Sequence, residues 1–228
     1  MKKLIFRFNN KGLQGSFSSE NILGGKGANL AQMAKLGLPV PPGFTISTEV
    51  CEYFYKNNKK IPKAVLKDTY KEIKIIENIT QKKFGDLKNP LLVSVRSGSR
   101  VSMPGMMDTI LNLGLNDKTV LALASKTSNM RFAKDSYRRF IQMYCSVVMG
   151  VDNYNFEELI ENYKLSKEVL LDTELDENDW DALIQDFKNV VKNKQKKIFH
   201  RMFLTNCMEL LVLYFYHGKA IELKFIEN

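Results

Sequence analysis

Short apolar runs along the chain predict β-strands. Residues 3–8 alternate enough for a half-buried strand, and residues 43–47 read as a strand after a proline-rich connection. Residues 91–95 form a continuous apolar, β-branched run typical of a buried strand. Residues 109–113 form a further run that is closed by Gly114. We therefore predict a strand at each of these places.

Longer stretches with apolar residues three and four positions apart predict helices between the strands. The strongest pattern lies within residues 129–151, where one helical face carries Phe132, Tyr137, Phe140, Ile141, Tyr144 and Val148. Further helices are predicted for residues 28–36, 49–55, 63–79, 119–126, 154–164 and 176–196. Helices and strands in this order predict an α+β fold.

Capping residues mark the ends of several of these helices. Thr48, one of Asn116 and Asp117, and Asp176 stand where a side-chain oxygen can accept the first backbone N–H groups. Gly37 stands where a glycine in the left-handed conformation ends a helix. We therefore expect the helices to begin and end near these residues.

The composition is that of a soluble, basic protein with a sizeable core. The chain has 228 residues, of which 44% are apolar, and its formal net charge is +9. A basic surface suits a polyanionic ligand such as ATP and also nucleic acid. The sequence contains no basic-aromatic RNA motif and no zinc-finger spacing, and its charge is spread along lysine-rich helices. Solvated helix faces account for most of that charge.

Cysteine usage and hydropathy indicate a cytoplasmic protein. Cys51, Cys145 and Cys207 are far apart and form no CxxC pair, which argues against a disulfide framework or a metal site. The apolar stretch at residues 4–6 is too short for a signal-peptide core, and the run at residues 210–216 is too short to span a bilayer. We expect no membrane partner.

The stretch after the predicted strand at residues 91–95 suits phosphate binding. Arg96 stands at the strand end, and Gly98, Ser99, Arg100 and Gly105 follow in a loop of small residues. Small residues let backbone N–H groups converge on an anion, and the guanidinium fork matches phosphate oxygens. The methionines at positions 103, 106 and 107 would make the loop an apolar flap. A hairpin with a polar loop explains the same residues equally well.

A second glycine-rich stretch precedes the predicted helix at residues 28–36. Gly24, Gly25 and Gly27 surround Lys26, so backbone N–H groups and a positive charge could face a phosphate. The spacing of a Walker A loop is absent. A glycine-rich helix start without a ligand is the commoner structure.

Two other groups of residues could also touch a nucleotide. Tyr53, Phe54 and Tyr55 could stack on a base, but we expect them to pack in the core. Arginines in the long predicted helix could reach phosphate, although salt bridges on the helix surface are the expected role of Arg131, Arg138 and Arg139.

The strings VRSGSRVSMPGMMDTILNLGLND and GGKGANL closely resemble the nucleotide-binding domain of the pyruvate, phosphate dikinase family, which is related to the phosphoenolpyruvate synthases. The resemblance extends to about Lys197. It implies the first part of an ATP-grasp-type domain with a helical excursion. It also implies that ATP is bound by Lys26, Arg96, Gly98, Ser99, Met103, Gly105 and Thr109.

The same resemblance sets expectations for the reaction and its partners. The family converts ATP, phosphate and pyruvate into AMP, pyrophosphate and phosphoenolpyruvate, and a histidine on a swivelling domain carries the phosphoryl group. It uses Mg²⁺ and a monovalent cation, whose ligands we do not find in this chain, and it forms homodimers. Central and pyruvate-binding domains would be the partners of this chain.

Residues 198–228 depart from the family. From Phe199 the chain reads FHRMFLTNCMELLVLYFYH, and a one-nucleotide shift in the reading frame would convert the family's text into several of these residues. Residues 220–222 then resemble the family again. We interpret residues 1–197 as the N-terminal part of the ATP-binding domain and the remainder as a frameshifted tail. Ordinary divergence of the tail is the alternative.

His200 and His217 lie in this tail, outside any glycine- and threonine-rich motif of the kind that carries the family's histidine. We therefore expect no catalytic residue and no metal ligand in the chain. The sequence predicts a fragment of the dikinase that holds part of the ATP site and is inactive alone. The alternatives are a non-catalytic nucleotide-binding or regulatory remnant and a basic nucleic-acid binder.

Overall fold

The computed structural model describes residues 3–9, 12–13, 20–58, 60–97, 109–194 and 221–225. The chain divides into two compact units. The first contains residues 1–83, 91–109 and 208–228, and the second contains residues 84–90 and 110–207. Each unit contributes its own core, and each is described separately below.

The first unit is built on an antiparallel sheet. Its strand order is β2 (Gly12–Leu13), β1 (Ile5–Asn9), β3 (Gly43–Ile46), β6 (Ile221–Phe225) and β4 (Val93–Ser97). β6 pairs with β3 through Phe44 and Leu223, and with β4 through Val95 and Leu223. A segment from the far end of the chain therefore lies between two strands that come much earlier in the sequence.

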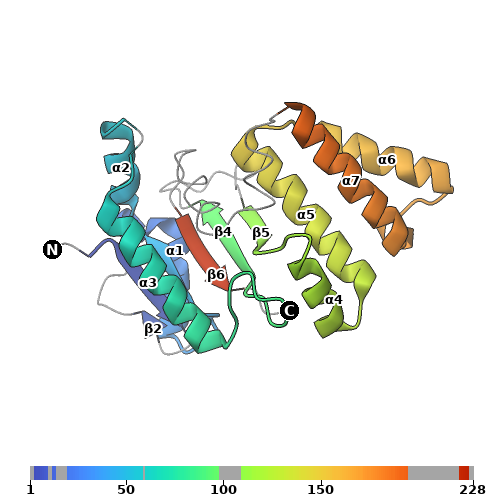
Figure 1. Ribbon diagram of the computed structural model, residues 1–228. Helices are drawn as coiled ribbons and strands as arrows, with labels where there is room; N and C mark the ends of the chain where they lie inside the picture. The colour runs from blue at the N-terminus through green and yellow to red at the C-terminus, as the bar shows by residue number, and fades with distance from the viewer. Residues whose placement is uncertain are drawn as a thin grey trace. The chain divides into compact units, whose positions relative to one another are not determined.

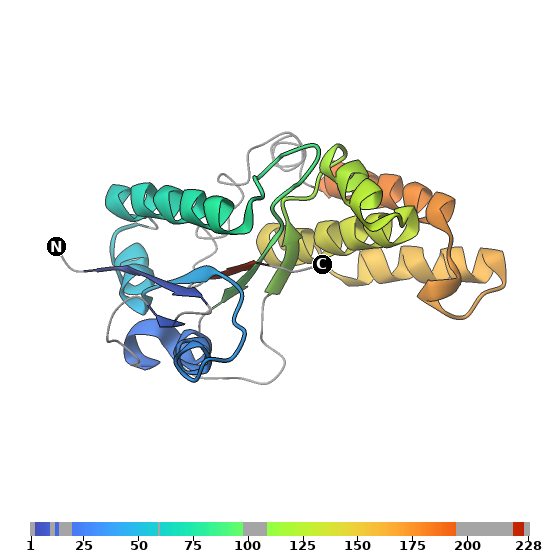
Figure 2. The same ribbon diagram turned by 90° about the horizontal axis from the view of Figure 1, so that it is seen from below.

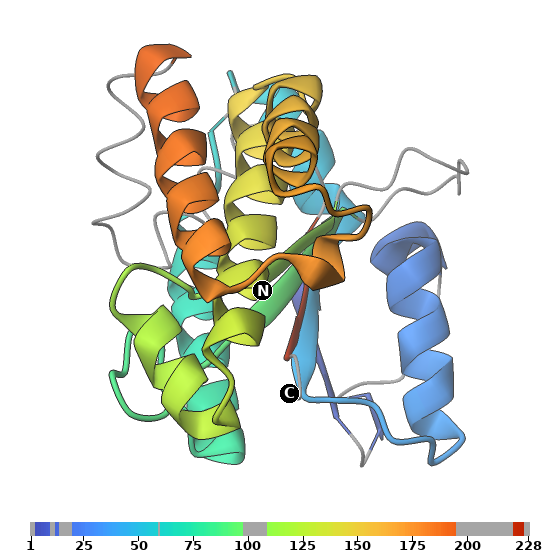
Figure 3. The same ribbon diagram turned by 90° about the vertical axis from the view of Figure 1, so that its right-hand side faces the viewer.

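Helices cover both faces of this sheet. α1 (Glu20–Lys35) lies on one face and α3 (Lys63–Thr80) lies on the other, as two perpendicular views show (Figures 2 and 3). α2 (Thr48–Lys56) follows β3 directly. Successive side chains of a strand point to opposite faces of the sheet. The side chains of β1 therefore alternate between the face covered by α1 and the face covered by α3.

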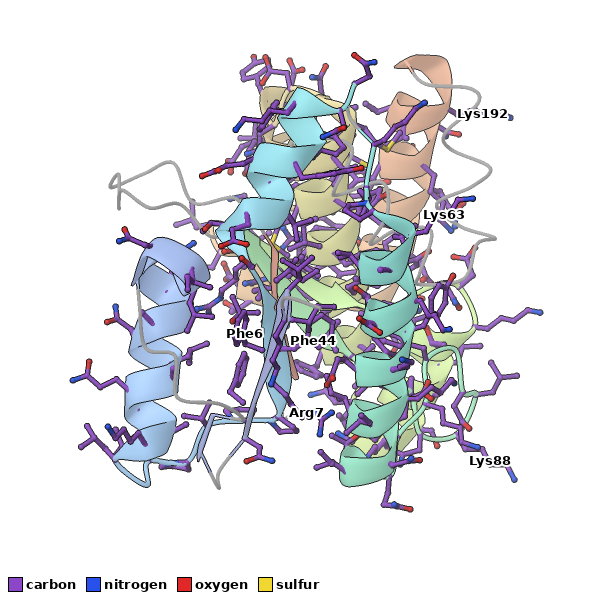
Figure 4. The ribbon with its side chains drawn as sticks, turned by 90° about the vertical axis from the view of Figure 1, so that its left-hand side faces the viewer. Phe6, Arg7, Phe44, Lys63, Lys88 and Lys192 are labelled. Carbon is purple, nitrogen blue, oxygen red and sulfur yellow. The ribbon has the colours of Figure 1, made fainter. Side chains whose placement is uncertain are left out.

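Phe6 and Phe8 of β1 pack on the α1 side, each in a cluster with buried residues of α1. Arg7, the residue between them, donates two hydrogen bonds to Glu72 of α3, from Nε at 2.6 Å and from a terminal nitrogen at 2.9 Å. The bond to Glu72 raises the pKa of Arg7 above its ordinary value, against the effect of burial. Figure 4 labels Phe6, Arg7 and Phe44 on the sheet between the two helices.

Several predicted boundaries in this unit were wrong, by one to eight residues. α1 begins eight residues before the predicted position, because a first helical turn precedes a kink at Gly24. Leu91 and Leu92 are buried but precede the ladder, so the strand predicted at residues 91–95 is Val93–Ser97. The N-cap of α2 is Ser47, whose Oγ accepts the N–H of Glu49 at 3.2 Å, and not Thr48 as predicted.

The second unit is helical. It contains α4 (Thr119–Thr127), α5 (Met130–Met149), α6 (Tyr154–Lys167), a short 3-10 turn η1 (Asp172–Glu174) and α7 (Glu177–Lys194) (Figure 1). α5 packs against α4 and α7, and α6 packs against α7. β5 (Thr109–Leu113) leads into this unit as predicted. Its largest fully buried side chains are Trp180, Tyr137, Tyr144, Phe140, Phe156 and Phe187.

Caps in the second unit agree well with the sequence. The residue that directly precedes α4 is Lys118, but of the two predicted residues Asn116 accepts the N–H groups of Lys118 and Thr119, both at 2.9 Å. Asp176 accepts the N–H groups at the start of α7. These backbone bonds lower the pKa of Asp176. Phe132 is the exception on the predicted apolar face of α5, because it is exposed.

The predicted α+β class is confirmed by these elements. In the part of the chain that is described, no helix combines the length and the hydropathy that crossing a membrane would require.

Candidate functional site

α1 is interrupted at the first glycine-rich stretch. Gly24 has φ 71° and ψ 166°, a backbone conformation that is essentially restricted to glycine. Helical geometry resumes at Gly25, so Lys26 and Gly27 belong to the first turn of a new helical segment. The first N–H groups of a helical segment lack intrahelical acceptors and can bind an anion. The kink therefore creates a helix start at the place where the sequence predicted phosphate contacts.

Gly27 holds this helix start directly against the sheet. A Cβ atom added at Gly27 would lie 2.9 Å from Cγ2 and 3.1 Å from Oγ1 of Thr45 in β3, and 3.2 Å from Cβ of Leu23. These distances leave no room for a side chain at position 27. A Cβ added at Gly25 would meet no atom of the described residues within 4 Å. The two glycines on either side of Lys26 therefore have different surroundings.

Arg96 lies on the same face of the sheet as this helix start. Glu222 of β6 is the register partner of both Thr45 in β3 and Arg96 in β4. Residues directly opposite one another in a sheet point to the same face. Thr45 faces α1 through its contact with Gly27, so Arg96 also belongs to the α1 face. Two strand spacings of about 4.8 Å separate their backbones.

Part of the Arg96 guanidinium has no hydrogen-bond partner among the described residues. The side chain is half-buried at the carboxyl end of β4, and its Nε is buried without a hydrogen-bond partner among the described residues. The Oγ1 of Thr45 is buried without a partner in the same sense, and Thr45 is 3% exposed. Unpaired buried polar atoms are uncommon in folded proteins and often mark a place where a ligand or water binds.

The structure describes only some of the predicted nucleotide contacts. Lys26 is half-buried on α1, Arg96 is the penultimate residue of β4, and Thr109 is the half-buried first residue of β5. The remaining predicted contacts lie outside the described residues, and these are Gly98, Ser99, Met103 and Gly105. Arg96 and the helix segment that carries Lys26 are the two predicted elements that share one face of the sheet.

The aromatic residues of α2 are placed differently from the prediction. Phe54 is buried, with 2% of its surface exposed, but Tyr53 and Tyr55 are 44% and 59% exposed. The expectation that all three pack in the core was therefore wrong for the two tyrosines. Helical geometry explains the difference, because three consecutive residues of a helix cannot all lie on one face.

The arginines of α5 are engaged within the second unit. Arg131 donates to the backbone carbonyls of Leu175 and Asp172, at 2.7 Å and 2.6 Å. Arg139 forms a surface ion pair with Asp135 at 3.1 Å, as expected. Arg138 was also expected on the surface, but its side chain is only 6% exposed. Its guanidinium carbon lies 4.6 Å from the centre of the Trp180 ring.

The described residues contain no group of three or more His, Cys, Asp or Glu side chains that could hold a metal ion.

Thr45 was not among the residues that the sequence predicted at the site. The available signal was a hydroxyl residue inside an otherwise apolar strand, GFTI, all four residues of which are buried.

Comparisons with known proteins find related sequences. Residues 20–77 match the family model described as pyruvate phosphate dikinase, AMP/ATP-binding domain. The chain is 51% identical over 192 residues to a pyruvate, phosphate dikinase of Clostridium symbiosum, a match that covers 84% of this chain and 22% of the relative. The enzyme of Entamoeba histolytica is 50% identical over 185 residues, or 81% of this chain and 21% of the relative.

A third relative aligns with the whole chain. The pyruvate, phosphate dikinase of Rickettsia prowazekii is 43% identical over 231 residues, which cover 100% of this chain and 26% of the relative. The chain thus spans roughly a fifth to a quarter of the relatives that it matches. Over most of its length this chain is similar to the pyruvate, phosphate dikinases, and residues 20–77 match the model of an AMP/ATP-binding domain.

Proposed function

We propose that this chain carries part of an ATP-binding site of the ATP-grasp type. The observation that carries the proposal is the common sheet face of Arg96 and of the helix segment that begins after Gly24. The name of the matching domain family supports ATP or AMP as the ligand. The proposed nucleotide contacts are Lys26, Arg96, Gly98, Ser99, Met103, Gly105 and Thr109.

The proposed role of these residues is to neutralise and orient phosphate groups. Phosphoryl transfer requires little covalent chemistry from the protein, so positioning and electrostatic stabilisation account for most of the catalysis. Arg96 would offer the planar fork that binds phosphate oxygens in pairs, and its Nε, which has no hydrogen-bond partner among the described residues, would supply one of the donors. The backbone N–H groups at the start of the helical segment would add fixed partial charges without an entropic cost of ordering.

We further propose that the chain contributes this site to the dikinase reaction and does not complete the reaction alone. Its relatives are about four times as long, since the matched residues cover 22% and 26% of two of them. Magnesium would accompany ATP, but the described residues offer no cluster of metal ligands, so we derive no step through the metal. The expected partners are the central and pyruvate-binding domains, and the expected compartment is the cytoplasm.

The proposal is tested by measuring ATP binding to the full chain by isothermal titration calorimetry. We expect weak binding by the wild type. Arg96→Ala should raise the dissociation constant about 10- to 100-fold, because a hydrogen bond to a charged group is worth about 1.5–3 kcal/mol. Arg139→Ala is the matched control, since that side chain is 54% exposed and lies in the second unit. Absent binding by the wild type, or equal effects of both variants, would overturn the proposal.

Two further measurements separate the proposal from its alternatives. The chain with ATP, phosphate, pyruvate, Mg²⁺ and ammonium should form no phosphoenolpyruvate in a coupled assay, and turnover would contradict its assignment as an incomplete site. Binding to single-stranded DNA or RNA with a steep dependence on salt, without a preference for ATP, would instead support the nucleic-acid alternative.

A further inference from the structure

We infer that the outer face of α3 is a docking surface for another protein, and that this partner presents a helix with carboxylates about one turn apart. The surface consists of Lys63, Lys67, Lys71 and Lys74, which we call the lysine row. All four side chains are exposed, and Figure 4 labels Lys63 at the start of the helix. α1 and α3 cover opposite faces of the sheet, so the lysine row is separate from the proposed nucleotide site.

The spacing of the lysine row follows the period of the helix. Successive residues of a helix are about 100° apart, so the four lysines lie within about 80° of one another around the axis. The face on the opposite side of the helix packs on the sheet, and its buried residues are Val65, Thr69, Ile73 and Ile76. The lysine row is therefore the part of α3 that points directly away from the core.

The three acidic residues of α3 lie outside the lysine row. Glu72 accepts two hydrogen bonds from Arg7 of β1, at 2.6 Å and 2.9 Å, and so holds α3 on the sheet. Asp68 pairs with Lys71 at 3.1 Å, and the buried Glu77 pairs with Lys74 at 2.6 Å. Each of these acids is thus already engaged within the first unit.

The first half of the lysine row has no such partner. Lys63 and Lys67 form no ion pair with any described residue. They stand one turn apart, and like charges at this spacing destabilise a helix. They also stand near the positive end of the helix dipole, where the first turn has no acidic residue and Pro62 provides no side-chain cap. This arrangement opposes folding of α3 but favours the binding of negative charge.

The shape and chemistry of the lysine row favour an acidic protein over a nucleic acid. Proteins that bind single strands use a basic groove in which successive bases stack on aromatic rings. The outer face of α3 is convex, and beside the lysines it has one exposed ring, that of Tyr70. α3 also contains no arginine, the residue that most often reads base edges. A partner helix with glutamates at every third or fourth position repeats the spacing of the lysines, so several ion pairs can form together.

The experiment measures binding of a fluorescein-labelled synthetic peptide to the full chain by fluorescence anisotropy. The probe is an alanine-based helix with glutamate at its first, fifth, ninth and twelfth positions. A second peptide carries the same four glutamates in succession and should bind several-fold more weakly. Binding of the first peptide should be saturable at about 50 mM salt and be lost at about 500 mM, because salt screens exposed charges.

Two double variants separate the lysine row from the overall charge of the chain. Lys63→Glu with Lys67→Glu should raise the dissociation constant of the peptide about tenfold or more, because two attractions become repulsions. Lys88→Glu with Lys192→Glu is the matched control, since it changes the net charge equally at exposed residues of the second unit. The control should raise the dissociation constant less than about twofold.

Amide hydrogen exchange in α3 shows whether the helix is intact in the first double variant. Exchange there should become slower, because acidic residues near a helix start are stabilising; faster exchange would overturn the argument that the lysines oppose folding. Equal effects of the two double variants, equal binding of the two peptides, or no saturable binding would overturn the docking surface. Binding of a single-stranded oligonucleotide in preference to the peptide, lost on Lys63→Glu with Lys67→Glu, would assign the lysine row to nucleic acid instead and overturn the inference.

Discussion

Arg138 offers the sharpest quantitative test of the second unit. Its guanidinium donates to Asp135 at 2.6 Å and to Gln142 at 3.1 Å, and it lies 4.6 Å above the ring of Trp180. Arg139 also pairs with Asp135, at 3.1 Å, but its side chain is 54% exposed, against 6% for Arg138. The two neighbouring arginines thus share one acceptor and differ in burial.

The magnitudes follow from that difference. Removal of one partner from a buried ion pair costs about 3–5 kcal/mol, and a desolvated cation–π contact is worth about 2 kcal/mol. Arg139 would still neutralise Asp135 after Arg138→Ala, so we expect a loss of about 3 kcal/mol in the free energy of unfolding. Arg139→Ala should cost about 0–1 kcal/mol, as for other exposed ion pairs. Arg138→Met keeps contact with Trp180 and should fall between the two.

Trp180 provides the assay. It is the single tryptophan of the chain and is fully buried in the second unit, so its fluorescence reports on the unfolding of that unit. With a urea dependence of about 1.5 kcal/mol per molar, Arg138→Ala should lower the unfolding midpoint by about 2 M. Arg139→Ala should lower it by less than about 0.7 M. Equal shifts for the two variants would refute the reasoning from burial.

Three further outcomes are expected. Asp176→Ala should lower the urea midpoint of unfolding at pH 7 but have less effect at pH 3. The reason is that a carboxylate whose pKa is lowered in the folded state stabilises the fold above its unfolded pKa and loses that effect as pH falls through the folded pKa. Equal effects at both pH values would contradict this reasoning. Deleting residues 220–228 should speed hydrogen exchange in β3 and β4, because β6 pairs with both strands. Deleting residues 226–228 is the control and should not change that exchange. Preserved protection after the longer deletion would count against the pairing. A thiol reagent at pH 8 should label the partly exposed Cys51 faster than Cys145, whose burial raises its pKa, as peptide mass spectrometry would reveal.

Periodicity was sufficient to predict most elements of this fold. The apolar face of α5 follows from spacing alone, because side chains repeat every 3.6 residues in a helix. The strand Thr109–Leu113 was predicted from a short apolar run closed by Gly114. Boundaries were less accurate where a local conformation decided them. The kink at Gly24 hid the first turn of α1, and the buried Leu91 and Leu92 looked like part of the strand that follows them.

The candidate site was only partly accessible to sequence reasoning. Lys26 and Arg96 were chosen from their glycine-rich surroundings and from the family resemblance, but the sequence could not show that their segments share one face of a sheet. Thr45 was missed because a single hydroxyl in an apolar strand carries no pattern. Its importance comes from a contact with Gly27, a residue 18 positions away.

The sequence by itself therefore determined the α+β class, the amphipathic faces and the residue types suited to phosphate. Only the tertiary structure decided that β6 separates β3 from β4, that Arg138 is buried and Arg139 is not, and that Gly25 and Gly27 differ in their surroundings. The physical reason is that propensity and periodicity act over a few residues along the chain. Register, burial and close approach depend on which distant segments are brought together in space.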